Sequence, residues 1–348
     1  VGGYALSANT TGANNVGVGS GSLQSNTTAS NNTAVGYSSL GANTTGAQNT
    51  AIGTASLTVN TTGLENFAGG YAALDANTTA SYGTAVGARA LQRNTTGANN
   101  TGLGYKALYT NTTGASNNAF GANSLDANTT GANNIAVGNS ALGANSTGSF
   151  NTAIGDSALA ANTTANDNVA VGQSALDANT TGASNVALGR DALGANTTGS
   201  TSTAVGASAL TANTTGAENT AVGHVALAAN TTGASNTAFG RASLNANTTA
   251  SYNTAYGTDT LQVNTTGANN TATGYRALFV NTTGYDNTAV GVSALTALTT
   301  AHANTAIGKT AGSLITTGSA NTILGRYDGN QGGLDIRTSS NNIVLSDG

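Results

Sequence analysis

The pattern of hydrophobic and polar residues repeats along this chain with a strict period of seventeen residues. Frames that start at Thr33 and Thr50 and continue to Thr305 align without an insertion or deletion, with the consensus TAVGxxALxANTTGAxN. Such self-similarity is typical of a solenoid, in which one repeat cannot bury its apolar side alone and stacks on the next. We number the seventeen positions of each copy as slots 1 to 17, counted from Thr33.

The apolar slots predict the core. Slot 8 is Leu in eighteen copies from Leu6 to Leu295, slot 3 is mostly apolar, and slots 2, 7 and 10 are mostly the small residue Ala. We expect these slots to point inward. The slot 8 residues include Leu40, Leu57 and Leu91, and the slot 3 residues include Val35, Ile52, Val86, Leu103, Phe120 and Val171.

Two slots are reserved for small residues. Slot 4 is Gly in every copy, including Gly36 and Gly53, which predicts a positive φ angle or a close backbone approach. Slot 14 is usually Gly but becomes Ala at Ala29 and Ala80, among other copies. The constraint at slot 14 is therefore one of size more than of backbone dihedral angle.

Short Thr, Val and Ala segments between Gly and Asn favour strands and turns over helices. A helix of period 3.6 would not carry Gly at two fixed points, and Leu, Glu and Lys would replace Thr and Asn. We predict an all-β fold, a parallel β-solenoid of about twenty seventeen-residue coils. At ~4.7–4.8 Å per coil, such a stack would be roughly 90–95 Å long.

The period divides the chain into two parts. Residues 1–321 form the repeat shaft, whereas residues 322–348, TILGRYDGNQGGLDIRTSSNNIVLSDG, break the period. We expect this second part to be a cap or a junction to a further domain. Because Val1 falls inside a repeat and no initiator Met precedes it, we expect the chain to be a fragment or a processed product.

Composition narrows the function. The chain has no Pro, Cys, Met or Trp, and its net charge is -4. Pro has no backbone N–H, so its absence indicates that nearly every coil donates backbone hydrogen bonds to a neighbour. The absence of Cys excludes disulfides and thiolate metal sites. An acidic chain without a basic cluster argues against nucleic acid and anionic membranes. No apolar run reaches the ~20 residues of a membrane span, so we expect no membrane insertion.

Charged residues indicate which slots face solvent. Up to Gly325 every Asp, Glu, Lys and Arg falls in slot 5, 6, 9 or 16, except Arg93 in slot 10. Charges are almost never buried unpaired, so these slots lie on the surface.

Slot 11 is Asn in seventeen copies, always followed by Thr-Thr or Ser-Thr. One interpretation is a column of N-linked sugars. The other is an inward ladder of stacked amides, which the later replacements Leu298 and Ile315 favour because an apolar residue suits a buried slot. The predicted ladder includes Asn26, Asn43, Asn60, Asn77, Asn94, Asn111 and Asn128.

The Thr pair of slots 12 and 13 raises the possibility of ice binding. Consecutive strand residues point to opposite faces, so only one of the two Thr columns faces out. Ice-binding solenoids typically present two outward columns as T-x-T, and slots 11 and 13, or 12 and 14, do not supply them. We retain ice binding as a second alternative function.

Candidate catalytic groups are sparse. His224 and His302 lie more than four coils apart, and Arg190 with Asp191 suits a solvated surface pair. No carboxylate pair recurs with the repeat, and G-V-G-S-G at residues 17–21 lacks the Lys of a phosphate loop. We predict no catalytic, cofactor-binding or metal site, and no enzyme activity.

Four tyrosines share slot 5, on the solvent side: Tyr37, Tyr71, Tyr105 and Tyr275. Such rings could stack on sugars of a host surface. The alternative is ordinary surface variation, because folded proteins expose much apolar surface.

The repeat resembles a known class of arrays. The segment NTAVGYSSLGANTTGAQNTAIG, residues 32–53, resembles the N-T-A-[IV]-G-x-x-A-L-x-x-N-T-T-G arrays of phage tail-fibre and related bacterial surface proteins. Its N-T-A-V-G core is similar to the head repeats of trimeric autotransporter adhesins. The resemblance implies a parallel homotrimer of left-handed β-rolls, often followed by a C-terminal chaperone, which this chain lacks.

The expectation is therefore a structural segment of a virion tail fibre or another extracellular fibre. It would act as a rigid spacer and as an adhesion element for a host-surface glycan or protein receptor. A bacterial surface adhesin or secreted filament at the cell surface is the first alternative. We also expect the chain to self-associate and to bind no cofactor.

Overall fold

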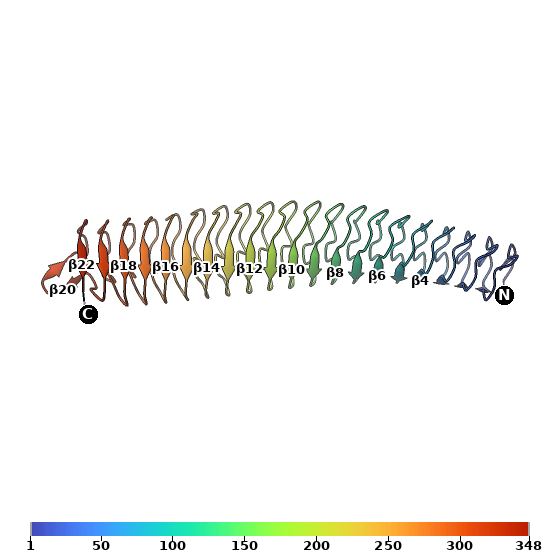
Figure 1. Ribbon diagram of the computed structural model, residues 1–348, viewed down its shortest axis with the longest axis horizontal. Helices are drawn as coiled ribbons and strands as arrows, with labels where there is room; N and C mark the ends of the chain where they lie inside the picture. Colours follow the sequence, from blue (N-terminus) through green and yellow to red (C-terminus); the bar gives the residue numbers. More distant parts are fainter. Residues whose placement is uncertain (1, 347–348) are drawn as a thin grey trace. The chain divides into compact units, whose positions relative to one another are not determined.

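The structure, a computed structural model, describes residues 2–346. The chain forms two compact units, Val1–Ser174 and Ala175–Gly348, and the described residues of both are all-β, without a helix. In each unit every coil contributes one three-residue strand, and neighbouring coils lie side by side (Figure 1). The prediction of a parallel β-solenoid is confirmed.

The first unit contains ten strands. Each pairs in parallel with the next, and equivalent slots face one another, as Thr33 faces Thr50 and Val35 faces Ile52. The strands are β1 (Val16–Val18), β2 (Thr33–Val35), β3 (Thr50–Ile52), β4 (Phe67–Gly69), β5 (Thr84–Val86), β6 (Thr101–Leu103), β7 (Asn118–Phe120), β8 (Ile135–Val137), β9 (Thr152–Ile154) and β10 (Val169–Val171).

The second unit continues the same pattern. Its regular strands are β11 (Val186–Leu188), β12 (Thr203–Val205), β13 (Thr220–Val222), β14 (Thr237–Phe239), β15 (Thr254–Tyr256), β16 (Thr271–Thr273), β17 (Thr288–Val290), β18 (Thr305–Ile307) and β19 (Thr322–Leu324). The last described coil departs from the period. β22 (Ile343–Leu345) pairs in parallel with β19, and the antiparallel hairpin β20 (Asn330–Gln331) and β21 (Leu334–Asp335) interrupts the coil between them. The change of period after residue 321 thus marks a longer coil that still adds a strand to the stack.

The core is narrow and consists of slots 2, 7, 8, 11, 14 and 17. The slot 8 residues Leu40, Leu57 and Leu91 have no exposed surface, and neither has the slot 2 residue Ala34. Burying one Leu side chain stabilises a fold by about 1.5–3 kcal/mol, and each coil adds one such residue.

The assignment of slot 3 to the core is wrong. Ile52 is 46% exposed and Phe120 is 40% exposed, and Val35 and Val86 are also exposed, while Leu103 and Val171 are half-exposed. The cause is strand alternation: because slot 2 points inward, the flanking slots 1 and 3 must point outward. Slot 10, also assigned to the core, is half-exposed in most copies as well.

The asparagine ladder of slot 11 is confirmed. Nδ2 of Asn43 donates to Oδ1 of Asn26 on the preceding coil at 2.9 Å and to the carbonyl of Gly46 on its own coil at 2.8 Å. The side chain is fully buried, so both amide protons are in use and no room remains for a sugar. The same pair of bonds recurs at Asn60, Asn77, Asn94, Asn111 and Asn128.

A second ladder, in slot 17, shares an acceptor with the first. Nδ2 of Asn49 donates to the carbonyl of Gly63 at 2.9 Å, and Nδ2 of Asn60 donates to the same oxygen at 3.1 Å. The slot 14 carbonyl therefore joins both ladders. Its residue lies buried between their amides, which explains why slot 14 admits only Gly or Ala.

The slot 11 ladder ends at Asn281. Leu298 and Ile315 take its place in the next two coils, and both are fully buried. Oδ1 of Asn281, which would accept from the next rung, is left without a hydrogen-bond partner. The apolar replacements that favoured an inward slot are thus buried as predicted, and the last amide loses one bond to them.

Backbone geometry explains slot 4. Gly36 and Gly53 have φ angles of 138° and 135°, a region that side chains rarely adopt. A Cβ at Gly36 would also lie 2.6 Å from the carbonyl carbon of Gly53 on the next coil. Both predicted reasons for Gly therefore hold at once.

Left-handed backbone also occurs at residues other than Gly, which the sequence did not reveal. Slots 6, 8 and 16 are left-handed in each coil, as at Ser38 (φ 53°), Leu40 (φ 52°) and Gln48 (φ 60°). Such residues cost about 1–2 kcal/mol each. Backbone N–H groups of the same coil, including those of Ser38 and Leu40, donate to carbonyls of neighbouring coils and offset that cost.

We expect Asn128→Ala to destabilise the fold. The substitution leaves Oδ1 of Asn111 without its donor and Nδ2 of Asn145 without its acceptor, at 2.7 and 2.9 Å respectively. Each buried group left unpaired costs about 1–3 kcal/mol. Urea unfolding followed by circular dichroism measures the loss. Thr130→Ala is the control, since Thr130 is exposed and should change stability by less than about 0.5 kcal/mol.

A pair of glycine substitutions separates dihedral angle from size. Gly138→Ala places Cβ on a residue with φ of 137° and 2.6 Å from the carbonyl carbon of Gly155, so we expect a cost of at least about 1–3 kcal/mol. Gly131→Ala also brings Cβ against the carbonyl oxygen of Gly148, so its neighbours must shift, but it requires no left-handed backbone and introduces the residue that slot 14 accepts in other copies. We therefore expect Gly131→Ala to cost less than Gly138→Ala. Equal melting temperatures for the two variants would contradict this distinction.

Candidate functional site

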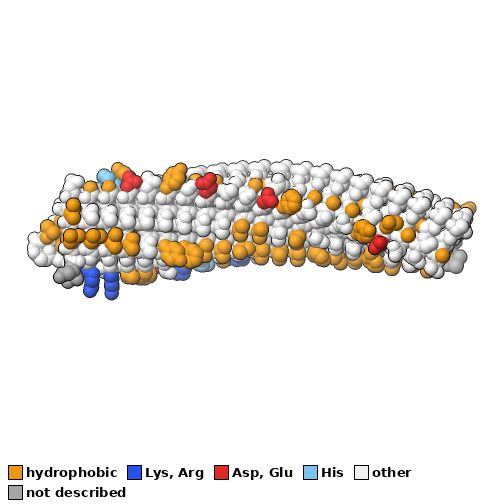
Figure 2. Space-filling model, in the orientation of Figure 1, with side chains coloured by type: hydrophobic (Ala, Val, Ile, Leu, Met, Phe, Trp, Pro, Cys, Tyr) orange, Lys and Arg blue, Asp and Glu red, His pale blue; other side chains and the backbone are white. Residues whose placement is uncertain are grey.

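The first candidate surface is the sheet face, which we define as slots 1 and 3 of the strands of one unit. Hydrophobic side chains stand in rows along the coils, and charged side chains are few and scattered (Figure 2). No strand carries a charged residue in slot 1 or slot 3. Neighbouring rings stack where both are aromatic, as Phe239 and Tyr256 do at 4.8 Å between centroids. The sheet face is an uncharged, partly apolar strip in each unit.

The Thr columns are divided as strand alternation requires. Oγ1 of Thr44, in slot 12, donates to the carbonyl of Thr61 on the next coil at 3.0 Å, whereas Thr45 in slot 13 is exposed. The outward pair of columns on one strand is instead slots 1 and 3. There Thr in slot 1 stands beside an apolar residue in slot 3, and at Thr271 and Thr273 both are Thr.

The second candidate surface is the turn formed by slots 5 to 10. All four predicted slot 5 tyrosines are exposed: Tyr37, Tyr71, Tyr105 and Tyr275. Tyr37, Tyr71 and Tyr105 belong to the first unit and Tyr275 to the second.

Two of these tyrosines belong to clusters that the sequence interpretation missed. Nζ of Lys106 lies 5.4 Å from the ring centroid of Tyr105 and 5.4 Å from that of Tyr109. Cζ of Arg93, from the preceding coil, lies 5.1 Å from the Tyr109 ring. In the second unit, Cζ of Arg276 lies 5.8 Å from the Tyr275 ring and 4.1 Å from the Phe279 ring. The signal was present in the sequence as GYKALY and GYRALF, residues 104–109 and 274–279.

The other charged candidates form local ion pairs. The Arg190 pair lies on the surface as predicted, whereas Asp259 in slot 6 is only 9% exposed, so the expectation that every charged slot faces solvent is wrong there. Arg190 and Asp191 lie 2.6 Å apart, and Arg241 pairs with Asp259 at 2.9 Å. His224 is exposed on a turn, and His302 stacks on Tyr285. Residues 2–346 contain no group of three His, Cys, Asp or Glu side chains arranged to hold a metal ion.

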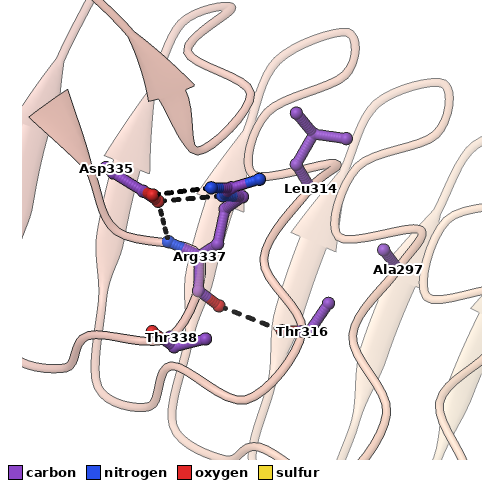
Figure 3. A pocket seen from close by; sticks show the side chains of 6 residues that line it. All are labelled: Ala297, Leu314, Thr316, Asp335, Arg337 and Thr338. Carbon is purple, nitrogen blue, oxygen red and sulfur yellow. Dashed lines mark hydrogen bonds and ion pairs between the residues drawn. The ribbon is translucent and has the colours of Figure 1, made fainter. Parts of the chain in front are cut away.

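A pocket of about 350 Å³ lies beside the C-terminal hairpin and is lined by Ala297, Leu314, Thr316, Asp335, Arg337 and Thr338. The carboxylate of Asp335 accepts from Nε and Nη2 of Arg337 at 3.0 and 2.7 Å, and from its backbone N at 3.1 Å (Figure 3). These bonds from Arg337 lower the pKa of Asp335 to about 2. Since the two charges satisfy each other, the pocket offers no free charged group for a ligand.

Thr316 ties this pocket to the regular coils. Its backbone N–H donates to the carbonyl of Arg337 at 2.9 Å, an interaction that crosses from the stack to the hairpin segment. The backbone N–H groups of Gly312 and Leu314 also donate to the carbonyls of Tyr327 and Asp328, both at 2.8 Å, so several backbone bonds join the longer coil to the stack. We assign the pocket a structural role at the end of the described stack.

Comparison of the chain with models of protein families and with curated proteins finds no match. Within residues 2–346, the structure has no helix of the length and apolar character that crossing a bilayer requires.

Proposed function

We propose that this chain is a structural segment of an extracellular or virion tail fibre, a rigid spacer that carries adhesion elements on its turns. One observation carries the proposal: the buried slots are nearly constant while slots 5, 6, 9 and 16, on the turns, vary freely. A catalytic site would require particular residues in one or two coils only. A fibre requires the same buried residues in every coil. We propose no enzymatic activity.

Stacking supplies the mechanical basis. Each coil is joined to the next by parallel strand pairing, by the two Asn ladders and by a Leu column. In a solenoid these nearest-neighbour terms add from coil to coil. A chain built in this way gains length without a change in its cross-section, which suits a spacer.

We further propose that copies of the chain associate through their sheet faces, as a parallel homotrimer. The face is uncharged in every coil and exposes slot 3 side chains that the narrow core cannot accommodate. Ten strands of three residues cover roughly 480 Å² at ~4.8 Å between strands and ~3.3 Å per residue. Side chains that stand out from the strands add to this area, and a stable interface buries roughly 800 Å² per partner.

The owner of the fibre is a phage or a cell. A bacterial surface adhesin or secreted filament would use the same frame and the same turns, and is our alternative within the structural class. In either case the proposed location is the virion or the cell exterior, and the proposed ligand is a receptor on a host surface.

Ice binding is a second candidate function, favoured by the outward Thr of slot 1 beside the apolar slot 3 on an in-register sheet. An ice-recrystallisation assay at micromolar protein tests it. If the fibre proposal holds, we expect ice crystals to grow in the presence of the wild-type chain as they do in a buffer control. Inhibition that disappears on introducing Asp into the sheet face would support ice binding instead.

Charge placed on the sheet face should separate the copies. We expect the wild-type chain to sediment at about three times its 33.5 kDa mass, and the double variant Val86→Asp/Val137→Asp at the monomer mass. Burying unpaired carboxylates in an apolar interface costs several kcal/mol each. Ala88→Asp/Asn139→Asp adds the same charge to slot 5 of the same coils and should remain trimeric. A wild-type monomer, or a trimeric face variant, contradicts the proposed association.

A further inference from the structure

The two cation–aromatic clusters share a pattern that surface variation does not explain. Among all copies, slot 9 is aromatic only at Tyr109 and Phe279. Both copies also have Tyr in slot 5 and a cation in slot 6, although slot 5 is Tyr in only four copies and slot 6 is a cation in only three. Slots that varied independently would seldom combine all three features twice. The same combination therefore recurs once in each unit.

The backbone brings the three side chains together in the same way in both units. Lys106 and Arg276 each have a φ of 56°, the left-handed conformation typical of slot 6. The cation then stands near both rings of its own coil, at 5.4 Å from each for Lys106 and at 5.8 and 4.1 Å for Arg276. Tyr105 and Tyr275 are exposed, and Tyr109 and Phe279 are half-buried. Each cluster is thus a positive charge between an exposed ring and a seated ring.

The cluster cations form no ion pair, as is also true of Arg89, Lys309 and Arg326 among the described residues. The ion pairs among residues 2–346 involve Arg190, Arg241 and Arg337, and none involves Arg93, Lys106 or Arg276. Asp126 on the next coil feels the charge of Lys106 but forms no ion pair with it.

Positive charge is concentrated at the first cluster. Arg89, Arg93 and Lys106 lie on two neighbouring coils and make up three of the nine Lys and Arg residues of a chain with net charge -4. Like charges on adjacent coils repel, and an anionic ligand would relieve that repulsion.

We infer that both clusters bind an acidic sugar, one carboxylate-bearing residue of a surface polysaccharide at each. The cation pairs with the sugar carboxylate, a charge-assisted hydrogen bond that it does not make within the chain. The exposed Tyr ring offers an apolar face to the C–H face of the sugar ring. This inference rests on the proposed adhesion function and names the ligand class of its turns.

The arrangement favours a sugar acid over other anions. Nucleic acid needs a run of cations along its backbone, whereas each cluster has one to three and the rest of the chain is acidic. A neutral sugar would use the rings and leave the cation without a role. A single contact of this kind is weak. Each chain has two clusters, and association of several chains raises that number, so binding at one cluster raises the effective concentration of the polysaccharide at the others.

The test measures binding of the full chain to immobilised polygalacturonate, and to the same polymer after complete methyl esterification. We expect wild-type protein to bind the carboxylated polymer only, and to lose binding as salt rises. Lys106→Gln/Arg276→Gln and Tyr105→Ala/Tyr275→Ala should each weaken binding by about tenfold or more, because either change removes one of the two sugar contacts from both clusters.

The matched control is Arg190→Gln/Lys309→Gln, which removes the same charge from exposed slot 5 residues outside both clusters. Its binding should stay within about twofold of wild type. Because the four cluster residues are on the surface, circular dichroism and sedimentation should be unchanged in every variant.

Three results would overturn the inference: no binding by the wild type, equal binding to the esterified polymer, or equal loss in the control variant. Sedimentation of the same samples keeps the two proposals apart. A wild-type trimer that does not bind polygalacturonate would contradict the acidic-sugar site but not the fibre proposal. A wild-type monomer that binds polygalacturonate through the clusters would contradict the proposed association but not the acidic-sugar site.

Discussion

The amide of slot 11 is the interaction on which the rest of the coil depends. One of its protons goes to the preceding rung and the other to the slot 14 carbonyl of its own coil, as at Asn60. That carbonyl also receives the slot 17 amide of the preceding coil. Three buried polar slots therefore satisfy one another inside a thin core, where an unpaired polar group is costly. The size limit at slot 14 follows from this shared acceptor.

Stacking in register also limits what the surface can carry. Equivalent slots of neighbouring coils are separated by only ~4.8 Å, so a charge repeated in one slot would form a column of like charges. The chain has 6% charged residues and scatters them over slots 5, 6, 9 and 16. Adjacent cations in one slot, as at Arg89 and Lys106, are exceptions that need a reason. An outside anion is the reason that we propose.

Much of the fold could be predicted from internal comparison of the copies, because each slot is sampled many times. The solvent side of slots 5, 9 and 16 followed from charge, although slot 6 is buried at Asp259, and the ladder followed from the apolar substitutes Leu298 and Ile315. Slot 3 could not be predicted from its apolar character alone, since a strand of three residues has one inward position and Ala occupies it. The left-handed backbone at Leu40 was equally hidden, because Leu rarely adopts it and gives no signal in composition. The clusters were missed because each slot was considered alone, while the information lay in the combination of slots 5, 6 and 9.

The outward direction of slot 3 connects the fold to the proposed assembly. A core that takes one Leu and two or three small residues from each coil leaves the Val, Ile and aromatic side chains of slot 3 in contact with water. Free solvent exposure would favour polar residues there, as it does in slots 5 and 9, yet slot 3 is uncharged in every regular strand and apolar in all of them except at Gly69 and Thr273. The turns carry charged residues and the sheet face does not. A surface that is held apolar although it lies outside the core is best explained by a second surface that covers it, and the uncharged sheet face of another copy has the matching character.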